Sequence, residues 1–171
     1  IHAQAAPRCM SHAPAAQIHD KTGSSYTAFE INAIDSGLVN IFNRSQTVDR
    51  NGRYSTSGSR THDQIINGEA GSHRIPYMLS AGNGGQRENN GNHQWGFFAQ
   101  SKQTKNGVVV GNLNTSTDLQ NSSSLGPFYD GRIAPTLSAD GSSVVTTSFS
   151  GGNFRYQGSG SGTSYASPAV A

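Results

Sequence analysis

Two short apolar runs constrain the fold of this chain more than any other feature: IPYMLSAGN (75–83) and NGVVVGNLN (106–114). Each run has the length of a strand and is bounded by Gly, Asn or Pro, which is typical of strands buried on both faces. Shorter patterns predict strands at AAQIHD (15–20), LVNIFN (38–43) and SSVVTT (142–147), and helices at TAFEINAIDSG (27–37) and HDQIINGEA (62–70). Strands alternating with helices predict an α/β fold, with a mostly parallel sheet and helices on both faces.

The predicted helix at 27–37 carries both a start and a stop signal. Thr27 and Glu30, three residues apart, fit a capping box at the helix start. Gly37 stands where a glycine commonly ends a helix. Apolar residues recur along the segment at helical spacing: Ala28, Ile31, Ile34 and Leu38. We therefore expect Asp35 to lie at the end of a surface helix.

The composition is that of a loop-rich globular protein. Of the 171 residues 33% are hydrophobic and 13% are charged, whereas disordered chains of low hydrophobicity are usually highly charged. The polarity comes from Ser, Thr, Asn, Gln and 21 Gly, a mix common in secreted proteins. The formal charge of +2 is scattered, which argues against nucleic acid or a membrane surface as partner. Cys9 is the single cysteine, so no intrachain disulfide forms.

The strongest functional signal lies at the end of the chain, in GSGSGTSYASPAVA (158–171). Gly162 leaves space beside Ser164, as a nucleophilic hydroxyl requires if substrate is to approach. The residues after Ser164 predict a helix start, with Pro168 near the first turn. Backbone N–H groups at a helix N-terminus favour a developing negative charge. Ser164 is therefore a candidate nucleophile.

Two other interpretations of this segment fit less well. In a flexible Gly/Ser linker we would not expect Tyr165, Pro168 and Val170, which are typical of an ordered helix. A phosphate-binding loop would need a Lys after the last Gly, where this chain has Thr163.

At this point the chain resembles a known family. The segment SGTSYASPAVA is similar to the nucleophile signature of the subtilisin-like serine proteases (subtilases, peptidase family S8), Gly-Thr-Ser-Met-Ala-x-Pro, with Tyr165 in place of Met. Further segments match in the same order: APAAQIHD (13–20), AIDSGLVNIFNRS (33–45), MLSAGNGG (78–85), NGVVVGNLN (106–114) and GPFYDGRIAPTLSADG (126–141). The resemblance is closest to large secreted bacterial subtilases. It implies a three-layer fold, of which residues 1–171 form the C-terminal portion of the catalytic domain.

The resemblance also implies roles for individual residues. Ser164 would be the nucleophile, and Asn83 would stabilise the oxyanion together with the backbone N–H of Ser164. Ser80, Ala81 and Gly82 would form one wall of the pocket for the side chain before the scissile bond. The segment Asn43–Thr47, which includes Ser45, would form the facing edge and pair with extended substrate. Gly162 and Thr163 would also border the substrate.

The sequence departs from the family at a few of these positions. Thr47 stands where the family usually has a Gly, which bears on how closely the substrate backbone can approach. Ala134 and Thr136 stand where the family has Lys and Asp in a mostly structural stretch.

Asp35 and His62 do not fit the other two triad positions. The catalytic Asp of subtilases ends a buried strand, whereas Asp35 follows helical periodicity. The catalytic His of the family starts a helix in His-Gly-Thr-His, whereas His62 stands in SRTHDQI and too near Asn83 along the chain. We therefore expect His and Asp in a missing N-terminal portion. On its own the 171-residue partial domain should be inactive, and it should fold poorly because Ala171 truncates the nucleophile helix.

These observations predict a secreted serine endopeptidase that acts on peptide or protein substrates through an acyl-enzyme on Ser164. Two alternatives remain open: a non-catalytic subtilase-like module that binds extended peptide, and a structural fragment of a larger assembly. We expect no required cofactor. Subtilases often bind calcium, but neither an EF-hand pattern nor clustered carboxylates assign a metal site in this sequence.

Overall fold

The computed structural model describes residues 26–45, 59–68, 74–85, 102–114, 118–128, 130–150 and 153–171. The helices are α1 (Tyr26–Asp35), α2 (Ser59–Ile66) and α3 (Thr163–Val170). The strands are β1 (Phe42–Arg44), β2 (Tyr77–Ser80), β3 (Val108–Leu113), β4 (Leu137–Asp140), β5 (Val144–Ser150) and β6 (Asn153–Gly160). The predicted strand at 15–20 lies outside the described residues.

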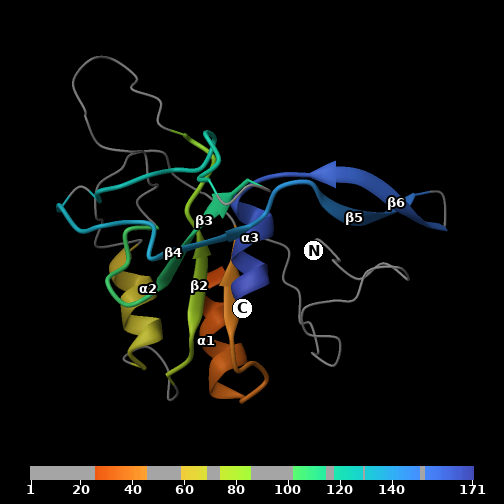
Figure 1. The fold of residues 1–171 in the computed structure, drawn as a ribbon. Coiled ribbons are helices and arrows are strands. Elements are labelled where there is room, and N and C mark those ends of the chain that lie inside the picture. The colour runs from red at the N-terminus through yellow and green to blue at the C-terminus, as the bar shows by residue number, and fades with distance from the viewer. Residues whose placement is uncertain are drawn as a thin grey trace.

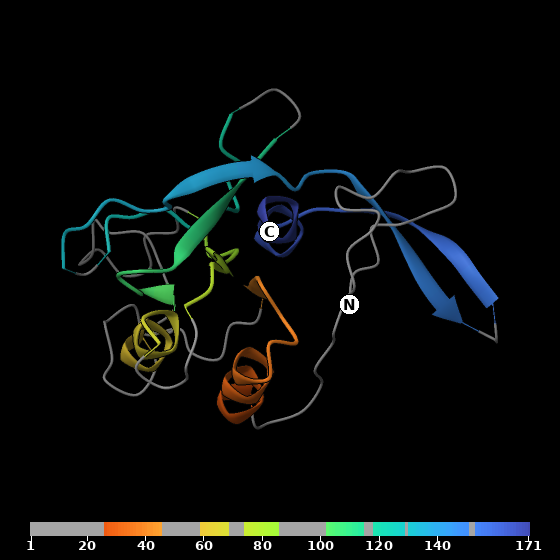
Figure 2. The same ribbon diagram turned by 90° about the horizontal axis from the view of Figure 1, so that it is seen from below.

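A parallel sheet with the strand order β1-β2-β3-β4 forms the centre of the molecule. Helices α1 and α2 cover one face of this sheet and α3 covers the other (Figures 1 and 2). The predicted three-layer α/β arrangement is therefore confirmed. Because all four strands run in one direction, their carboxyl ends meet at one edge, where open α/β sheets bind ligands.

The core explains why the apolar runs become strands. All four residues of β2 are buried, and in β3 only the two end residues are partly exposed. The core cluster consists of buried residues from the two central strands and two loops: Tyr77, Leu79, Ala81, Val109, Phe128 and Ala134. Central strands need apolar side chains on both faces, which is the pattern of these two runs.

Strands β5 and β6 form an antiparallel hairpin outside the main sheet. The hairpin extends away from the body of the molecule and returns to the start of α3 (Figure 1). The sequence predicted only a short strand at 142–147. The hairpin partner β6 was not predicted, since the alternation of Phe154 and Tyr156 with polar residues is short and runs directly into Gly-Ser-Gly.

Several predicted boundaries were wrong. Helix α1 starts at Tyr26, so Thr27 lies within the helix and not at its N-cap. The side chain of Glu30 accepts hydrogen bonds from Arg44 and Tyr77, so it does not close a capping box. The strand predicted at 38–43 begins only at Phe42, and helix α2 begins at Ser59, before the predicted start at position 62.

The end of α1 follows the prediction. The N–H of Gly37 donates to the carbonyl of Ile34, and the N–H of Leu38 donates to that of Ala33. Gly37 has a φ of +65°, the left-handed conformation that glycine adopts without strain. Asp35 is the last residue of the helix and is exposed, as expected.

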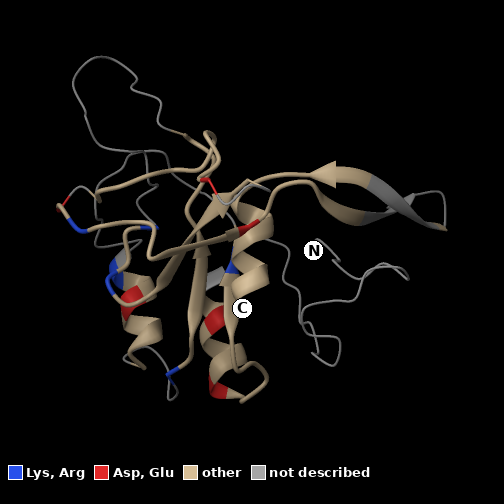
Figure 3. Cartoon of the chain, in the orientation of Figure 1, with Lys and Arg blue, Asp and Glu red and all other residues tan. Residues whose placement is uncertain are grey.

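Charged residues are spread over the described part of the molecule. Lys and Arg lie on α2, β1 and the loops, interspersed with Asp and Glu, and they do not form a stripe (Figure 3). Within the described residues, no helix is long and apolar enough to cross a bilayer.

Candidate active site

Ser164 is the second residue of α3, at the helix end that faces the carboxyl edge of the sheet. The preceding Gly162 has a φ of +153°, which a residue with a side chain rarely adopts, so the turn into the helix requires glycine. The Oγ of Ser164 donates to the carbonyl of Ser45 over 3.3 Å. Three N–H groups of this turn already have acceptors, since that of Thr163 donates to Asn83 Oδ1 and those of Tyr165 and Ala166 donate to the carbonyl of Gly162. Within the described residues, the N–H of Ser164 is the first-turn donor that remains for a ligand.

Pro168 lies farther into α3 than predicted. It is an internal residue of the helix and not part of the first turn. Proline has no N–H to donate to the carbonyl four residues earlier, which is that of Ser164. The hydroxyl of Ser45 donates to this carbonyl instead, over 3.4 Å. Ser45 and Ser164 are therefore joined by two reciprocal hydrogen bonds.

Asn83 follows β2 and is exposed beside the start of α3. Its Oδ1 accepts hydrogen bonds from the backbone N–H of Thr163 over 3.0 Å and from the Thr163 hydroxyl over 3.1 Å. The same hydroxyl accepts from the N–H of Gly82 over 3.0 Å. Because Oδ1 accepts from Thr163, Nδ2 is the amide group of Asn83 that has no partner among the described residues, and it is the group that an oxyanion would need.

The end of β2 and the residues after it are fixed by burial and by backbone hydrogen bonds. Ser80 and Ala81 are each 1% exposed, and the N–H of Ala81 donates to the carbonyl of Val110 in β3. Gly82 has a φ of +110°, and its carbonyl accepts from the N–H of Ser124. The predicted wall Ser80–Gly82 therefore leads from the central strand directly to the Thr163 hydroxyl.

The segment at the end of β1 contacts the same helix. Asn43 Oδ1 accepts from the hydroxyl of Ser167 over 2.6 Å, and Asn43 Nδ2 donates to Ser45 Oγ over 3.2 Å. The structure thus brings Asn43 and Ser45 together with Ser164. Thr47, the far end of the predicted edge, lies outside the described residues.

Sequence reasoning missed several residues that support this arrangement. Ser167 is fully buried and anchors α3 to β1 through Asn43. The N–H of Gly141 donates to Asn112 Oδ1, and the carbonyl of Gly141 accepts from the N–H of Gly162. The sequence did not mark Ser167, Gly141 or Asn112 as functional, since Asn, Ser and Gly are abundant throughout the chain.

His62 lies on α2, on the opposite face of the sheet from α3 (Figure 2). Its Nε2 is 2.8 Å from Arg44 Nη1, and its ring centroid is 5.5 Å from that of Tyr77. Arg44 also forms a 2.9 Å ion pair with Glu30, which is 1% exposed. Burial raises the pKa of Glu30, and the Arg44 charge partly opposes that rise. The structure places His62 and Asp35 apart from Ser164, in keeping with their rejection as its partners.

Metal ligands do not gather in the described part of the chain. No group of three or more His, Cys, Asp or Glu side chains there is arranged to hold a metal ion. The arrangement around Ser164 instead offers a hydroxyl, the amide N–H₂ of Asn83 and the backbone N–H of Ser164.

The comparisons with known proteins bear on this arrangement. The profile of the subtilase family, Peptidase_S8, matches residues 9–171. No curated protein matches the sequence.

Among solved structures, the PatG macrocyclase in complex with peptide is similar with a TM-score of 0.61, at 14% identity over 85% of this chain and 38% of that chain. The prenylagaramide maturation protease PagA has a TM-score of 0.58, at 19% identity over 90% and 49%. The patellamide maturation protease PatA has a TM-score of 0.59, at 16% identity over 96% and 48%. This chain thus spans less than half the length of these solved chains, and the likeness is one of fold.

Proposed function

The chain belongs to the subtilase family, and from that membership we propose that it is part of a serine endopeptidase that acts through an acyl-enzyme on Ser164. One observation carries the proposal. Ser164 lies at the N-terminus of α3, beside an Asn83 amide whose oxygen is held by Thr163. The segments at the ends of β1 and β2 approach the same helix end.

These residues suit acyl transfer. The Oγ of Ser164 would attack the carbonyl carbon of the substrate while its proton passes to a histidine base and then to the leaving amine. Water would hydrolyse the resulting ester and restore the hydroxyl. In both steps the negatively charged oxygen would lie between Asn83 Nδ2 and the N–H of Ser164.

We propose that the histidine base and its orienting Asp come from a portion of the protease outside residues 1–171. Two findings support this. His62, the one histidine in the described part of the chain, is on the far face of the sheet beside Arg44. The similar solved chains are about twice as long as this one, since it covers 38% to 49% of them.

An active-site-directed fluorophosphonate tests the proposal on the full-length protease. It should attach to Ser164, as located by peptide mass spectrometry, and Ser164→Ala should abolish the labelling. Ser161→Ala provides a matched control, because Ser161 is an exposed serine in the same segment. A full-length protein that binds extended peptide but neither labels nor cleaves would instead be a non-catalytic binding module.

A further inference from the structure

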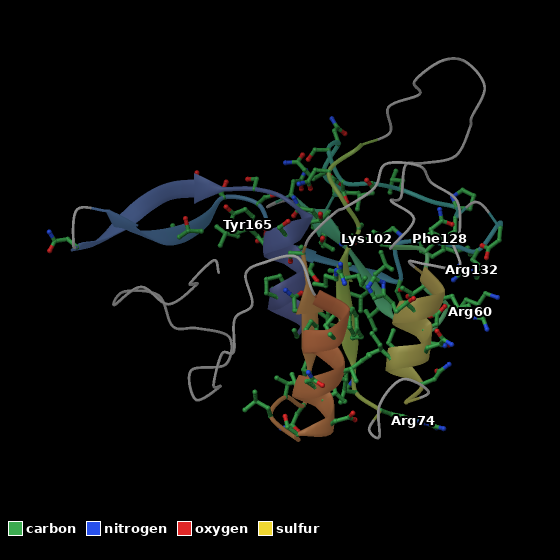
Figure 4. All side chains as sticks on the ribbon, turned by 180° about the vertical axis from the view of Figure 1, so that it is seen from behind. Arg60, Arg74, Lys102, Phe128, Arg132 and Tyr165 are labelled. Atoms are coloured by element: carbon green, nitrogen blue, oxygen red, sulfur yellow. The ribbon has the colours of Figure 1, made fainter. Side chains whose placement is uncertain are left out.

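Lys102 is fully buried at the carboxyl edge of the sheet, the edge that the start of α3 and Ser164 face, although no local sequence pattern marks it. Its Nζ donates to the backbone carbonyl of Arg44 over 3.3 Å and to the hydroxyl of Ser80 over 3.1 Å. Figure 4 shows Lys102 within the body of the molecule, in contrast to Arg60 and Arg74 at its periphery. This amine therefore links the last residue of β1 to the last residue of β2.

These two acceptors belong to the two segments assigned to the substrate pocket. Arg44 is part of the Asn43–Thr47 edge, and Ser80 begins the Ser80–Gly82 wall. The paired residues of β1 and β2 end at Arg44 and Leu79, so Lys102 Nζ binds the two strands where their pairing ends. Lys102 thus lies at the junction of the two walls that would enclose the side chain before the scissile bond.

The charge of Lys102 is not compensated within the described part of the chain. Both acceptors of its hydrogen bonds are neutral oxygens. Burial, and then the positive charge of Arg44, lower its pKa from 10.5 to about 7. The Arg44 guanidinium on β1 already has the Glu30 carboxylate of α1 as its partner, with His62 of α2 and Tyr77 of β2 around that pair.

A lysine whose only role here was packing would destabilise the fold. Burying an ammonium group without a counter-ion costs roughly several kcal/mol. A neutral donor could bind the Arg44 carbonyl and the Ser80 hydroxyl at a lower cost in free energy. An anion brought close to Lys102 would offset that cost. In a dry pocket the attraction between two charges acts over several ångströms, so it does not require direct contact.

We propose that Lys102 determines specificity, by making the pocket between the two walls select substrates with Asp or Glu before the scissile bond. This inference rests on the proposed function, because it assigns the substrate class of the same site. It specifies that the preferred substrate side chain is anionic, whereas family membership alone does not specify that side chain.

Two fluorogenic peptides that differ only in Glu or Gln before the scissile bond provide the test, because these side chains match in shape and differ in charge. The full-length protease is assayed at pH 6, where Lys102 is mostly protonated. We expect kcat/KM to favour Glu by about tenfold or more, as a single screened charge pair can provide. Lys102→Gln keeps an N–H donor for the wall oxygens but removes the charge, so the ratio should fall to near one.

Lys105→Met and Lys102→Met are the matched pair of controls, since Lys105 is exposed in the same segment. The first should retain the Glu preference and the second should lose it. Cleavage of the Gln peptide by Lys102→Gln reports that this variant is folded.

The outcomes are distinguishable. A wild-type ratio near one, or a Glu preference that persists in Lys102→Gln, overturns the inference while the protease activity stands. The wild-type ratio decides this even if every Lys102 variant fails to fold. A full-length protein that cleaves neither peptide and takes no fluorophosphonate label overturns the proposed function, and this inference with it.

Discussion

At the scale of single residues, the site depends on how Thr163 directs the amide of Asn83. A side-chain amide can present either its oxygen or its nitrogen to a substrate. Here two hydrogen bonds from Thr163 hold the oxygen, and the N–H of Gly82 fixes the Thr163 hydroxyl in turn. The nitrogen is therefore the group left for an oxyanion.

Asn83→Ala should lower kcat by about 100- to 1000-fold with little change in KM, because the oxyanion contact forms only in the transition state. Thr163→Val should give a smaller loss of kcat, since it removes one of the two hydrogen bonds that hold the amide. Steady-state kinetics of the full-length protease on a peptide substrate measure both. Asn121→Ala, a change at an exposed asparagine, should leave kcat unaltered. An equal rise of KM in Asn83→Ala would point to ground-state binding instead.

Lys102 should make the stability of the protein depend on pH. Its pKa is about 7 in the folded state against 10.5 for an ordinary lysine, so between these values the unfolded chain binds the extra proton. Stability conferred by the neutral amine is then greatest above pH 10.5 and is lost as pH falls toward 7. As pH rises between these limits, the free energy of unfolding of wild type should therefore increase relative to that of Lys102→Met by roughly 1 kcal/mol per pH unit.

Urea unfolding at pH 7, 8 and 9 measures this difference between wild type and Lys102→Met. The free energy of unfolding of Lys105→Met should change with pH as that of wild type does, because Lys105 is exposed. A difference that does not change with pH would mean that Lys102 keeps its proton throughout.

At the scale of elements, helix α3 is positioned by strands that are distant in sequence. It contacts β1, β2, β3 and β4, the whole of the parallel sheet. Ser167 joins it to β1 through Asn43, and Gly141 at the end of β4 joins it through Gly162. The position of Ser164 is thus set by both edges of the described sheet.

Ser167→Ala should destabilise the protein by about 1 to 3 kcal/mol, because it removes the donor to Asn43 Oδ1 in a buried position. The loosened end of β1 should also raise KM for peptide substrates more than it lowers kcat. Denaturant unfolding and steady-state kinetics provide the two readouts. Ser159→Ala, at an exposed serine, should change neither. Wild-type stability in Ser167→Ala would show that the 2.6 Å contact is energetically unimportant.

Gly141→Ala should displace the turn that carries Ser164, the proposed nucleophile. A Cβ at this position would lie 2.5 Å from the backbone N of Ala166 and 2.7 Å from the carbonyl O of Gly162, so backbone must move. We expect a loss of about 1 to 3 kcal/mol in stability and a marked loss of kcat. Gly158→Ala is the control, since its Cβ would meet nothing within 4 Å. Unchanged kcat in Gly141→Ala would contradict the proposed coupling between β4 and the nucleophile turn.

At the scale of the whole molecule, the described residues around Ser164 include the proposed nucleophile and the proposed oxyanion donor, and no histidine base lies among them. Residues 1–171 expressed alone should therefore show no more than the residual catalysis that an oxyanion hole supports. Adding the portion that supplies His and Asp should restore turnover. A peptide cleavage assay on the isolated and completed proteins measures this. Robust turnover by the isolated chain would refute the proposal that its base lies elsewhere.

Sequence predictability differed between the centre and the periphery of the fold. Strands β2 and β3 were predicted because they are apolar on both faces, a pattern that only central strands require. Strand β4 was not predicted, because LSAD lies at the edge of the described sheet and is partly exposed. The start of β1 was predicted too early, since the apolar residues Leu38 and Ile41 proved to be exposed in a loop.

The sequence by itself determined the family, the parallel fold and the candidates Ser164 and Asn83, because these depend on local motifs and on strand composition. Tertiary structure alone decided that Thr163 orients Asn83, that Ser167 anchors Asn43, and that Lys102 joins the two wall segments. These contacts link residues that are 22 to 124 positions apart. No local pattern encodes such pairs, since hydrogen bonds of this kind form only where the packed sheet brings distant segments within reach.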